Sequence, residues 1–304
     1  MRRPIIVVFF SLFLMACQAL GAERGALFKV TANGNVLHLY GTIHAGRADY
    51  YPLEPRIREA VAAAPTLALE VDATRDPSAN AAAFRQYGMY PAGSPGRASL
   101  PAARRLRIEA GLKQQGMDPV AVARLKPWMV ATMLAVNDAV RLGYDPALGV
   151  DHHLAQLARS DKPGKGGKGS KTRIAELESM GYQLALLNRL PEEAQWQLLE
   201  ETLDTMASGR QLRETRELFA AWERADQKAL DAIALRIERD DTLGGKFMRE
   251  VLLEERNGPM ADKVASLLAR ENNAVVAVGL LHLVGKRGVP ELLRQRGMKV
   301  ERVY

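Results

Sequence analysis

The stretch "LHLYGTIHAG", from Leu37 to Gly46, is an apolar run that ends in Gly-Thr-Ile-His. A similar run, Ala26 to Thr31, precedes it, and Ala-Asn-Gly-Asn at 32–35 separates the two. An Asn-Gly pair between two strand-like runs is typical of a tight hairpin turn, because both residues tolerate positive φ. The sequence therefore predicts a β-hairpin whose second strand, Val36 to Ile43, ends just before His44.

A helix and a third strand are expected directly after this hairpin. Pro55 to Ala64 has the composition of a helix that begins at a proline, and Pro65 interrupts it. Thr66 to Val71, "TLALEV", is a short apolar run typical of a buried strand. Strand, helix and strand joined by short links form a βαβ unit, which indicates an α/β sheet.

The middle of the chain is rich in helix patterns and its C-terminal end returns to strands. Helices are expected over residues 81–87, 102–115, 119–125, 127–142, 149–159 and 289–296, and over 191–273 with breaks near Gly209, Gly244-Gly245 and Gly258-Pro259. Further strands are expected over 172–177, 274–281 and 298–304. The predicted fold class is α/β: a mixed β-sheet built from N- and C-terminal strands, flanked by helices, with a large helical insertion in the middle. Residues 23–304 would form a single domain whose helical cap spans about 76–160 and 178–273.

Composition limits the classes of function. The chain has 304 residues, 47% hydrophobic and 25% charged, which is ordinary for a globular protein. The formal net charge of +7 equals the contribution of seven locally grouped basic residues: Arg2, Arg3, Lys162, Lys165, Lys168, Lys171 and Arg173. The remaining charges balance, so no basic face is indicated and no nucleic-acid partner is expected.

The N-terminus has the pattern of an export signal. Two arginines precede the apolar run Ile5 to Ala16, which is too short to span a bilayer comfortably. We expect a signal peptide over residues 1–22 with two competing processing sites. One is a lipobox that would make Cys17, the only cysteine, the acylated first residue; the other is the group of small residues at 19–22. The expected protein is exported, either periplasmic or lipid-anchored to the bacterial outer membrane, and contacts membranes only through the signal or an anchor at Cys17.

Three residues far apart in the sequence form the candidate site. His44 and His282 each end a strand-like run in the pattern Gly-x-x-His, and Glu70 ends the run "TLALEV". A buried carboxylate is costly unless a cation or strong donors compensate it. The carboxyl ends of parallel strands meet at one sheet edge, where ligands usually bind. Two imidazoles and a carboxylate can hold a divalent ion and leave positions open for water and substrate. A lone histidine is more often structural, but the repeated context favours function.

Other candidates are weaker. The loop "GKGGKGSKT" resembles a phosphate-binding loop, but Ser170 stands where the lysine is required. His38 lies mid-strand, where a supporting role is the alternative, and the pair His152-His153 lies in a predicted helix where neighbours face different ways. Arg256-Asn257 is either a helix terminus with a cap or a pair that aims a guanidinium at substrate.

The segments "LYGTIHAG", "LALEVD", "LGVDHHL", "LLEERNGPMADKV" and "VAVGLLHLVGKRG" together resemble the TraB/GumN family, related to the Tiki metalloproteases, over about residues 27–303. The resemblance implies that His44, Glu70 and His282 form a metal-dependent catalytic centre and are its metal ligands. It implies a substrate-binding or transition-state role for Arg256 and Asn257, and matches Asp151 to the family's Gly-x-Asp position. The chain departs from the family in a Gly/Lys insertion after Lys162-Pro163, which is expected to be a surface loop and leaves the role of Glu176 and Glu178 open.

The expected function is that of an exported metal-dependent hydrolase acting on a peptide or protein substrate. The Tiki resemblance points to Mn²⁺ or Co²⁺, and histidine ligands also suit Zn²⁺. Glu70 would be either a third ligand or the general base. One alternative is a non-catalytic peptide-, haem- or metal-binding lipoprotein of the same fold. Another is a metal hydrolase acting on an ester or a glycan-linked group.

Overall fold

The structure is a computed structural model that describes residues 21–160 and 172–304. The predicted signal peptide, apart from its last two residues, and the predicted Gly/Lys loop at 161–171 lie outside the described residues, as does Cys17. Within those two ranges, every helix is too short or too polar to cross a membrane.

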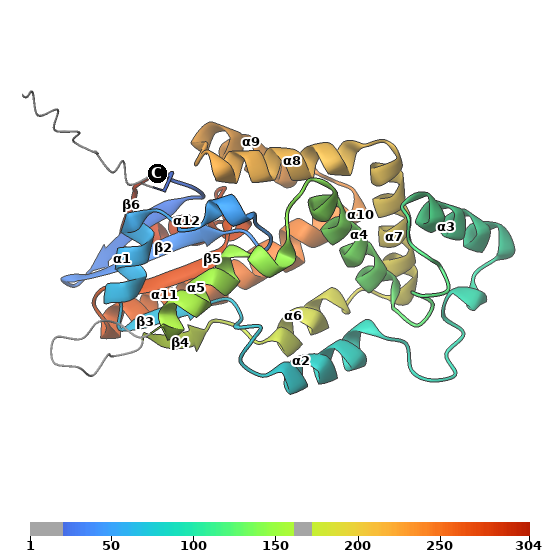
Figure 1. Cartoon of the computed structure of the whole chain (residues 1–304), viewed down its shortest axis with the longest axis horizontal. Helices are drawn as coiled ribbons and strands as arrows, with labels where there is room; N and C mark the ends of the chain where they lie inside the picture. The colour runs from blue at the N-terminus through green and yellow to red at the C-terminus, as the bar shows by residue number, and fades with distance from the viewer. Residues whose placement is uncertain (1–20, 161–171) are drawn as a thin grey trace, which may run out of the picture.

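The centre of the fold is a mixed six-stranded sheet in the order β4-β3-β5-β2-β1-β6 (Figure 1). The strands are β1 (Leu27–Ala32), β2 (Asn35–Thr42), β3 (Thr66–Leu69), β4 (Arg173–Glu176), β5 (Ala274–Gly279) and β6 (Lys299–Arg302). Neighbours from β4 to β2 are parallel, whereas β1 is antiparallel to both β2 and β6. The predicted α/β class, with one sheet built from both ends of the chain, is confirmed.

The predicted hairpin joins β1 to β2. Ala32 pairs with Asn35 across the turn, and the two turn residues have positive φ, 51° at Asn33 and 82° at Gly34. Two consecutive positive φ angles match the right-handed twist of the strands, which explains why Asn-Gly occupies this turn.

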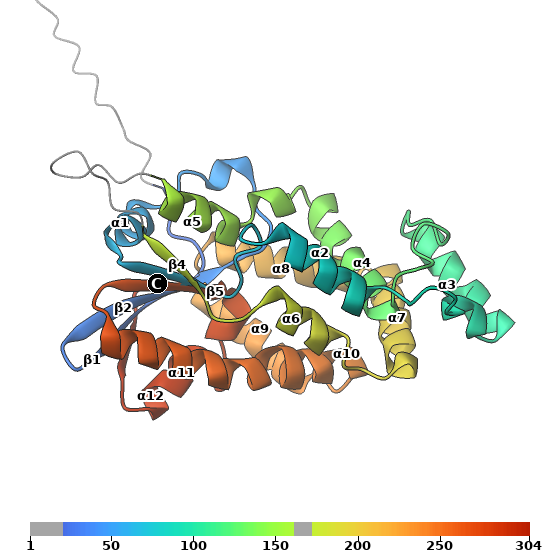
Figure 2. The ribbon, with the colours of Figure 1, turned by 90° about the horizontal axis from the view of Figure 1, so that it is seen from below.

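Helices cover both faces of the sheet (Figure 2). α1 (Pro55–Ala63) and α5 (Val150–Arg159) lie on one face, and α11 (Glu255–Arg270) and α12 (Val289–Gln295) lie on the other. Their buried side chains, such as Ile57, Leu154 and Val264, join the buried strand residues in one hydrophobic cluster. α5 and α11 therefore belong to the layers that hold the sheet, although each lies at the end of a helical segment predicted as cap.

The remaining helices extend to one side of the sheet (Figure 1). They are α2 (Pro77–Ala83), α3 (Ala102–Gln114), α4 (Pro127–Arg141), α6 (Met180–Leu187), α7 (Glu192–Ala207), α8 (Arg210–Glu223), α9 (Gln227–Arg239) and α10 (Leu243–Lys246). A second hydrophobic cluster, with Leu112, Leu134 and Leu199 among its members, fills the space between α3, α4 and α7.

Two local expectations are wrong. Residues 119–125 form turns instead of a helix, and α11 continues through Gly258-Pro259, where a break was expected. The break expected near Gly244-Gly245 falls slightly earlier, at 240–242, because both glycines lie inside α10. A π-helical segment, η5 (Phe247–Glu254), directly precedes α11. Pro259 is the fifth residue of α11, and its ring removes one helical hydrogen bond without ending the helix. The break near Gly209 is confirmed, because Gly209 has φ 68° between α7 and α8.

Candidate functional site

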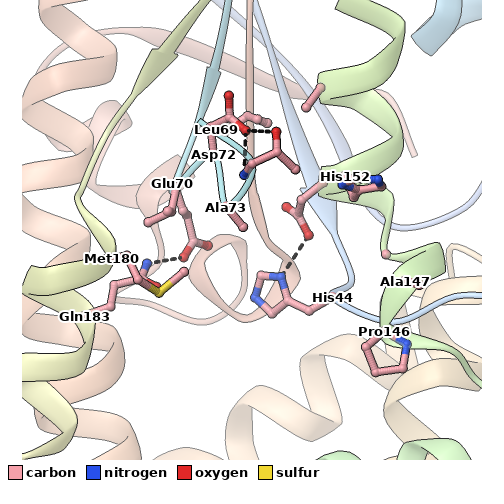
Figure 3. A pocket seen from close by; sticks show the side chains of 15 residues that line it. His44, Leu69, Glu70, Asp72, Ala73, Pro146, Ala147, His152, Met180 and Gln183 are labelled. Atoms are coloured by element: carbon pink, nitrogen blue, oxygen red, sulfur yellow. Dashed lines mark hydrogen bonds and ion pairs between the residues drawn. The ribbon is translucent and has the colours of Figure 1, made fainter. Parts of the chain in front are cut away.

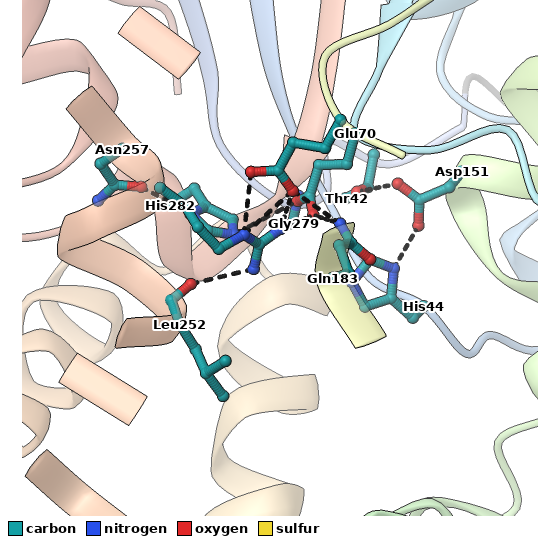
Figure 4. Close-up of polar contacts among 11 residues, drawn as sticks. Thr42, His44, Glu70, Asp151, Gln183, Leu252, Asn257, Gly279 and His282 are labelled. Carbon is teal, nitrogen blue, oxygen red and sulfur yellow. Dashed lines mark hydrogen bonds and ion pairs between the residues drawn. The ribbon is translucent and has the colours of Figure 1, made fainter. Parts of the chain in front are cut away.

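His44, Glu70 and His282 lie together at the carboxyl edge of the sheet (Figure 4). Glu70 follows β3 directly, His44 follows β2 by two residues, and His282 lies in η6 (Leu280–Leu283), the short 3₁₀ turn after β5. These three parallel strands are adjacent in the sheet, so their ends meet. The Nε2 atom of His282 is 3.6 Å from Oε1 of Glu70.

Gly279, the last residue of β5, borders all three side chains. A Cβ atom at this position would lie 3.1 Å from Oε1 of Glu70, 3.4 Å from Nε2 of His44 and 3.7 Å from Cδ2 of His282. The absent side chain of this glycine therefore leaves a space that two imidazoles and one carboxylate surround. Glycine at the first position of the second Gly-x-x-His motif thus has a steric reason.

The orientation of His44 is set by Asp151. Oδ2 of Asp151 accepts from Nδ1 of His44 at 2.8 Å, and Oδ1 accepts from the Thr42 hydroxyl at 2.5 Å. A carboxylate only accepts, so Nδ1 of His44 carries a proton and Nε2 is directed away from Asp151. The charge of Asp151 is the largest cause that raises the pKa of His44, to about 9.

Backbone contacts bring Asp151 to His44. The Val150 amide at the start of α5 donates to the Ile43 carbonyl at 2.9 Å. A Cβ atom at Gly149 would lie only 2.7 Å from the His44 carbonyl oxygen, a distance that real Cβ atoms do not reach. Glycine in the Gly-x-Asp pattern thus allows α5 to approach the end of β2, which places the aspartate two residues later beside the imidazole.

His282 is buried, with 4% of its surface exposed. Nδ1 of His282 is 2.6 Å from Oδ1 of Asn257 in α11. Burial is the largest cause that lowers the pKa of His282, to about 4, so the ring is neutral at neutral pH. Both histidines of the site are therefore held through Nδ1. Nε2 of His282 lies near Oε1 of Glu70, and Nε2 of His44 borders Gly279.

Glu70 is a buried carboxylate with partners on both oxygens. Oε2 accepts from Nη2 of Arg256 at 2.7 Å and from the Gln183 amide at 3.2 Å, and Oε1 accepts from the Gly279 amide at 2.5 Å. Burial acts to raise the pKa of Glu70, but the two histidines, Arg256 and the Gly279 N–H together lower it to about 2. Glu70 is therefore ionised at every physiological pH.

Arg256 lies behind Glu70, buried between two carboxylates. Its Nε and Nη2 donate to Glu178 at 2.8–3.1 Å, and Nη1 donates to the Leu252 carbonyl at 3.0 Å. That carbonyl belongs to the π-helical η5. The guanidinium is thus engaged by protein groups, and the expected contact of Arg256 with substrate stays a prediction. Glu178 and Gln183 join this network, and Gln183 has no sequence signal that distinguishes it.

The donor set is chemically suited to a divalent cation. Within residues 21–160 and 172–304, no group of three or more His, Cys, Asp or Glu side chains is already arranged as metal ligands. Nε2 of His44, Oε1 of Glu70 and the Cδ2 edge of the His282 ring nevertheless border the same space beside Gly279. The carboxylates of Glu70 and Glu178 and the guanidinium of Arg256 have a combined charge of −1. This negative charge favours the binding of a cation.

A pocket of about 450 Å³ opens onto this site (Figure 3). His44 and Glu70 line it, together with Asp72, His152 from α5 and Met180 from α6. Of the weaker candidates, His153 stacks on Tyr51 at 3.9 Å between ring centroids, and His38 lies mid-strand opposite Lys29. His44 is therefore accessible from this pocket.

Comparison with known proteins gives one consistent result. The profile of the TraB/PrgY/gumN family matches residues 26–302. The uncharacterized protein YbaP of Escherichia coli (strain K12) is 28% identical over 270 residues, which cover 87% of this chain and 90% of that protein. YbaP of Shigella flexneri is 28% identical over 261 residues, 84% of this chain and 87% of that protein. No solved structure matches the chain.

Proposed function

Because this chain belongs to the TraB/PrgY/gumN family, we propose that it is an exported metal-dependent hydrolase that cleaves a peptide or protein substrate at the edge of the sheet. One observation carries the proposal: two histidines and a glutamate, held by separate partners, border the space beside Gly279. The export signal at residues 1–22 and the lipobox at Cys17 support the export part, as periplasmic or lipid-anchored protein.

In this proposal, Nε2 of His44, Nε2 of His282 and Oε1 of Glu70 hold a divalent ion, Mn²⁺, Co²⁺ or Zn²⁺. The bound ion would supply Lewis-acid polarisation of a scissile carbonyl and activation of a water molecule. Oε2 of Glu70 is occupied by Arg256 and Gln183, whereas Oε1 accepts only from the Gly279 amide, so Oε1 is the oxygen with a lone pair left for the ion. Asp72, His152 and Met180 line the approach and would contact the substrate.

The charge on Glu70 favours the ligand role over the general-base role. An effective general base has a pKa near the working pH, whereas the pKa of Glu70 is lowered to about 2. A carboxylate that remains ionised and faces two imidazoles suits a cation ligand. We therefore propose Glu70 as a third ligand.

The sharpest test of metal binding is Gly279→Ala. This change removes no ligand but places a methyl group 3.1 Å from Glu70 Oε1 and 3.4 Å from His44 Nε2. The matched control is Gly258→Ala, whose Cβ atom would have no neighbour within 4 Å. Calorimetric titration of the chelator-treated protein with Mn²⁺, Co²⁺ and Zn²⁺ should show one site in wild type and in Gly258→Ala, and weak or no binding in Gly279→Ala. Equal binding by all three proteins would contradict the proposed site.

Turnover separates the hydrolase from a binding protein of the same fold. Metal-dependent cleavage of a peptide library should be lost in His44→Ala and in His282→Ala, with the fold checked by circular dichroism. Metal binding without cleavage of peptides or esters would favour the binding protein, and cleavage of esters alone would favour the ester hydrolase. Cleavage that is unchanged in both variants would reject the assignment of these histidines.

A further inference from the structure

The hydrogen bonds of Asn257 determine which nitrogen of His282 carries its proton. The side-chain amide Nδ2 of Asn257 donates to the Arg287 carbonyl at 2.8 Å. A backbone carbonyl can only accept, so the NH₂ group must face Arg287 and Oδ1 must face His282. Oδ1 can only accept as well, and it lies 2.6 Å from Nδ1 of His282. The proton of the neutral ring is therefore on Nδ1, and Nε2 has a free lone pair.

This arrangement opposes the preference of Glu70. Nε2 of His282 is 3.6 Å from the ionised Oε1 of Glu70. With a proton on Nε2, the ring would be attracted to that carboxylate and would donate to it after a small rotation. Such a pair would leave Nε2 without a free lone pair and would occupy Oε1 of Glu70, and these two atoms are the ones proposed to hold a cation. Something must therefore hold the proton at Nδ1.

We propose that Asn257 is a positioning residue: anchored on the Arg287 carbonyl, it fixes the Nδ1–H tautomer of His282 and so keeps Nε2 and Glu70 available to a cation. The tautomer itself follows from contacts within the chain. Its consequence for a metal ion rests on the proposed function. Asn257 is 2% exposed in α11, so the anchor is shielded from competing water.

The test is ¹⁵N-histidine NMR of the metal-free protein at neutral pH, with His282 assigned through His282→Gln. Two-bond ¹H–¹⁵N spectra distinguish a protonated Nδ1 from a protonated Nε2. Wild type should show His282 protonated at Nδ1. In Asn257→Leu, which has no acceptor, the proton should move to Nε2 beside Glu70. Asn257→Asp restores an acceptor and should retain the Nδ1–H form.

Arg287→Ala is the matched control, because it removes the side chain but leaves the carbonyl that anchors Asn257, and its His282 spectrum should equal that of wild type. Titration with Zn²⁺ alone is the second measurement. Residues that orient a metal ligand typically contribute about 10- to 100-fold to metal affinity. Asn257→Leu should therefore bind Zn²⁺ more weakly than wild type by about that factor. Asn257→Asp should recover part of the lost affinity.

An Nε2–H form in wild type, or an unchanged Nδ1–H form in folded Asn257→Leu, would overturn the inference. If Asn257→Leu does not fold, the wild-type and Asn257→Asp spectra decide. The expected tautomers in a protein that binds no Zn²⁺ would support the role of Asn257 and reject the metal site, so the two proposals fail separately.

Discussion

At the scale of single residues, the guanidinium of Arg256 stabilises an unusual concentration of negative charge. Glu70 and Glu178 have 8% and 5% of their side-chain surface exposed, and both lie within 2.8 Å of Nη2. Two carboxylates buried this closely repel each other strongly unless a cation lies between them. Arg256 therefore keeps Glu70 ionised and correctly oriented, whatever it also does for a substrate.

Replacing Arg256 by Met should destabilise the protein by about 3–5 kcal/mol, because two buried carboxylates lose their cation. The double change Arg256→Met with Glu178→Gln removes one charge of each sign and should recover a large part of this loss. Urea denaturation of the metal-free proteins measures both values. A double variant as unstable as the single one would show that packing, and not charge, is the contribution of Arg256.

Sequence patterns identify some residues of this site and miss others for a physical reason. The Gly-x-x-His motifs stand out because both the glycine and the histidine are chemically constrained, and they predict the meeting of His44 with His282. Glu70 stands out because it interrupts an apolar run. Gln183 reaches Glu70 from a helix with no such pattern, and its contact arises only when α6 packs over the end of β3. Contacts of that kind depend on tertiary packing, which a single sequence does not encode locally.

At the scale of elements, the site depends on the close approach of α5 to the end of β2. Gly149 has φ −59° and ψ 142°, which alanine adopts without strain, so its absent Cβ matters through space alone. The sequence predicts the two elements correctly, because each has its own periodicity. It does not predict η5, because a π-helical segment and the α-helix after it share the same apolar spacing.

Gly149→Ala should move α5 away from the His44 carbonyl and weaken the bond between Asp151 and His44. We expect a loss of about 1–3 kcal/mol in the free energy of unfolding, as for other overpacked contacts. The ¹⁵N signals of His44 should shift at the same time, because its partner has moved. Gly181→Ala, whose Cβ atom would have no neighbour closer than 4.0 Å, is the control and should leave both unchanged. A stable Gly149→Ala with unshifted His44 signals would contradict this account of the glycine.

At the scale of the whole molecule, one hydrophobic cluster joins the sheet to its covering helices and to α8 and α9, and a second cluster holds the outer helices α3, α4 and α7 together. The first contains the strands whose ends present His44, Glu70 and His282, and the second lies among α3, α4 and α7. The sequence predicts this division in outline, because strand patterns gather at its two ends and helix patterns in its middle. The order of the strands could not be predicted, because it depends on which distant runs pair, and only the assembled sheet fixes that choice.

If the ligands depend on the first cluster alone, a cavity in the second should lower stability without changing metal binding. Leu199 in α7 and Leu69 at the end of β3 are each 1% exposed, so they form a matched pair. Each change to alanine should cost about 2–5 kcal/mol in chemical denaturation. Zn²⁺ titration at a temperature at which both variants remain folded should give the wild-type affinity for Leu199→Ala. For Leu69→Ala the affinity should fall by about tenfold or more, because Glu70 is the next residue. Equal losses of affinity in both variants would mean that the outer helices and the sheet hold the site jointly, and the ligand geometry would then be a property of the whole molecule.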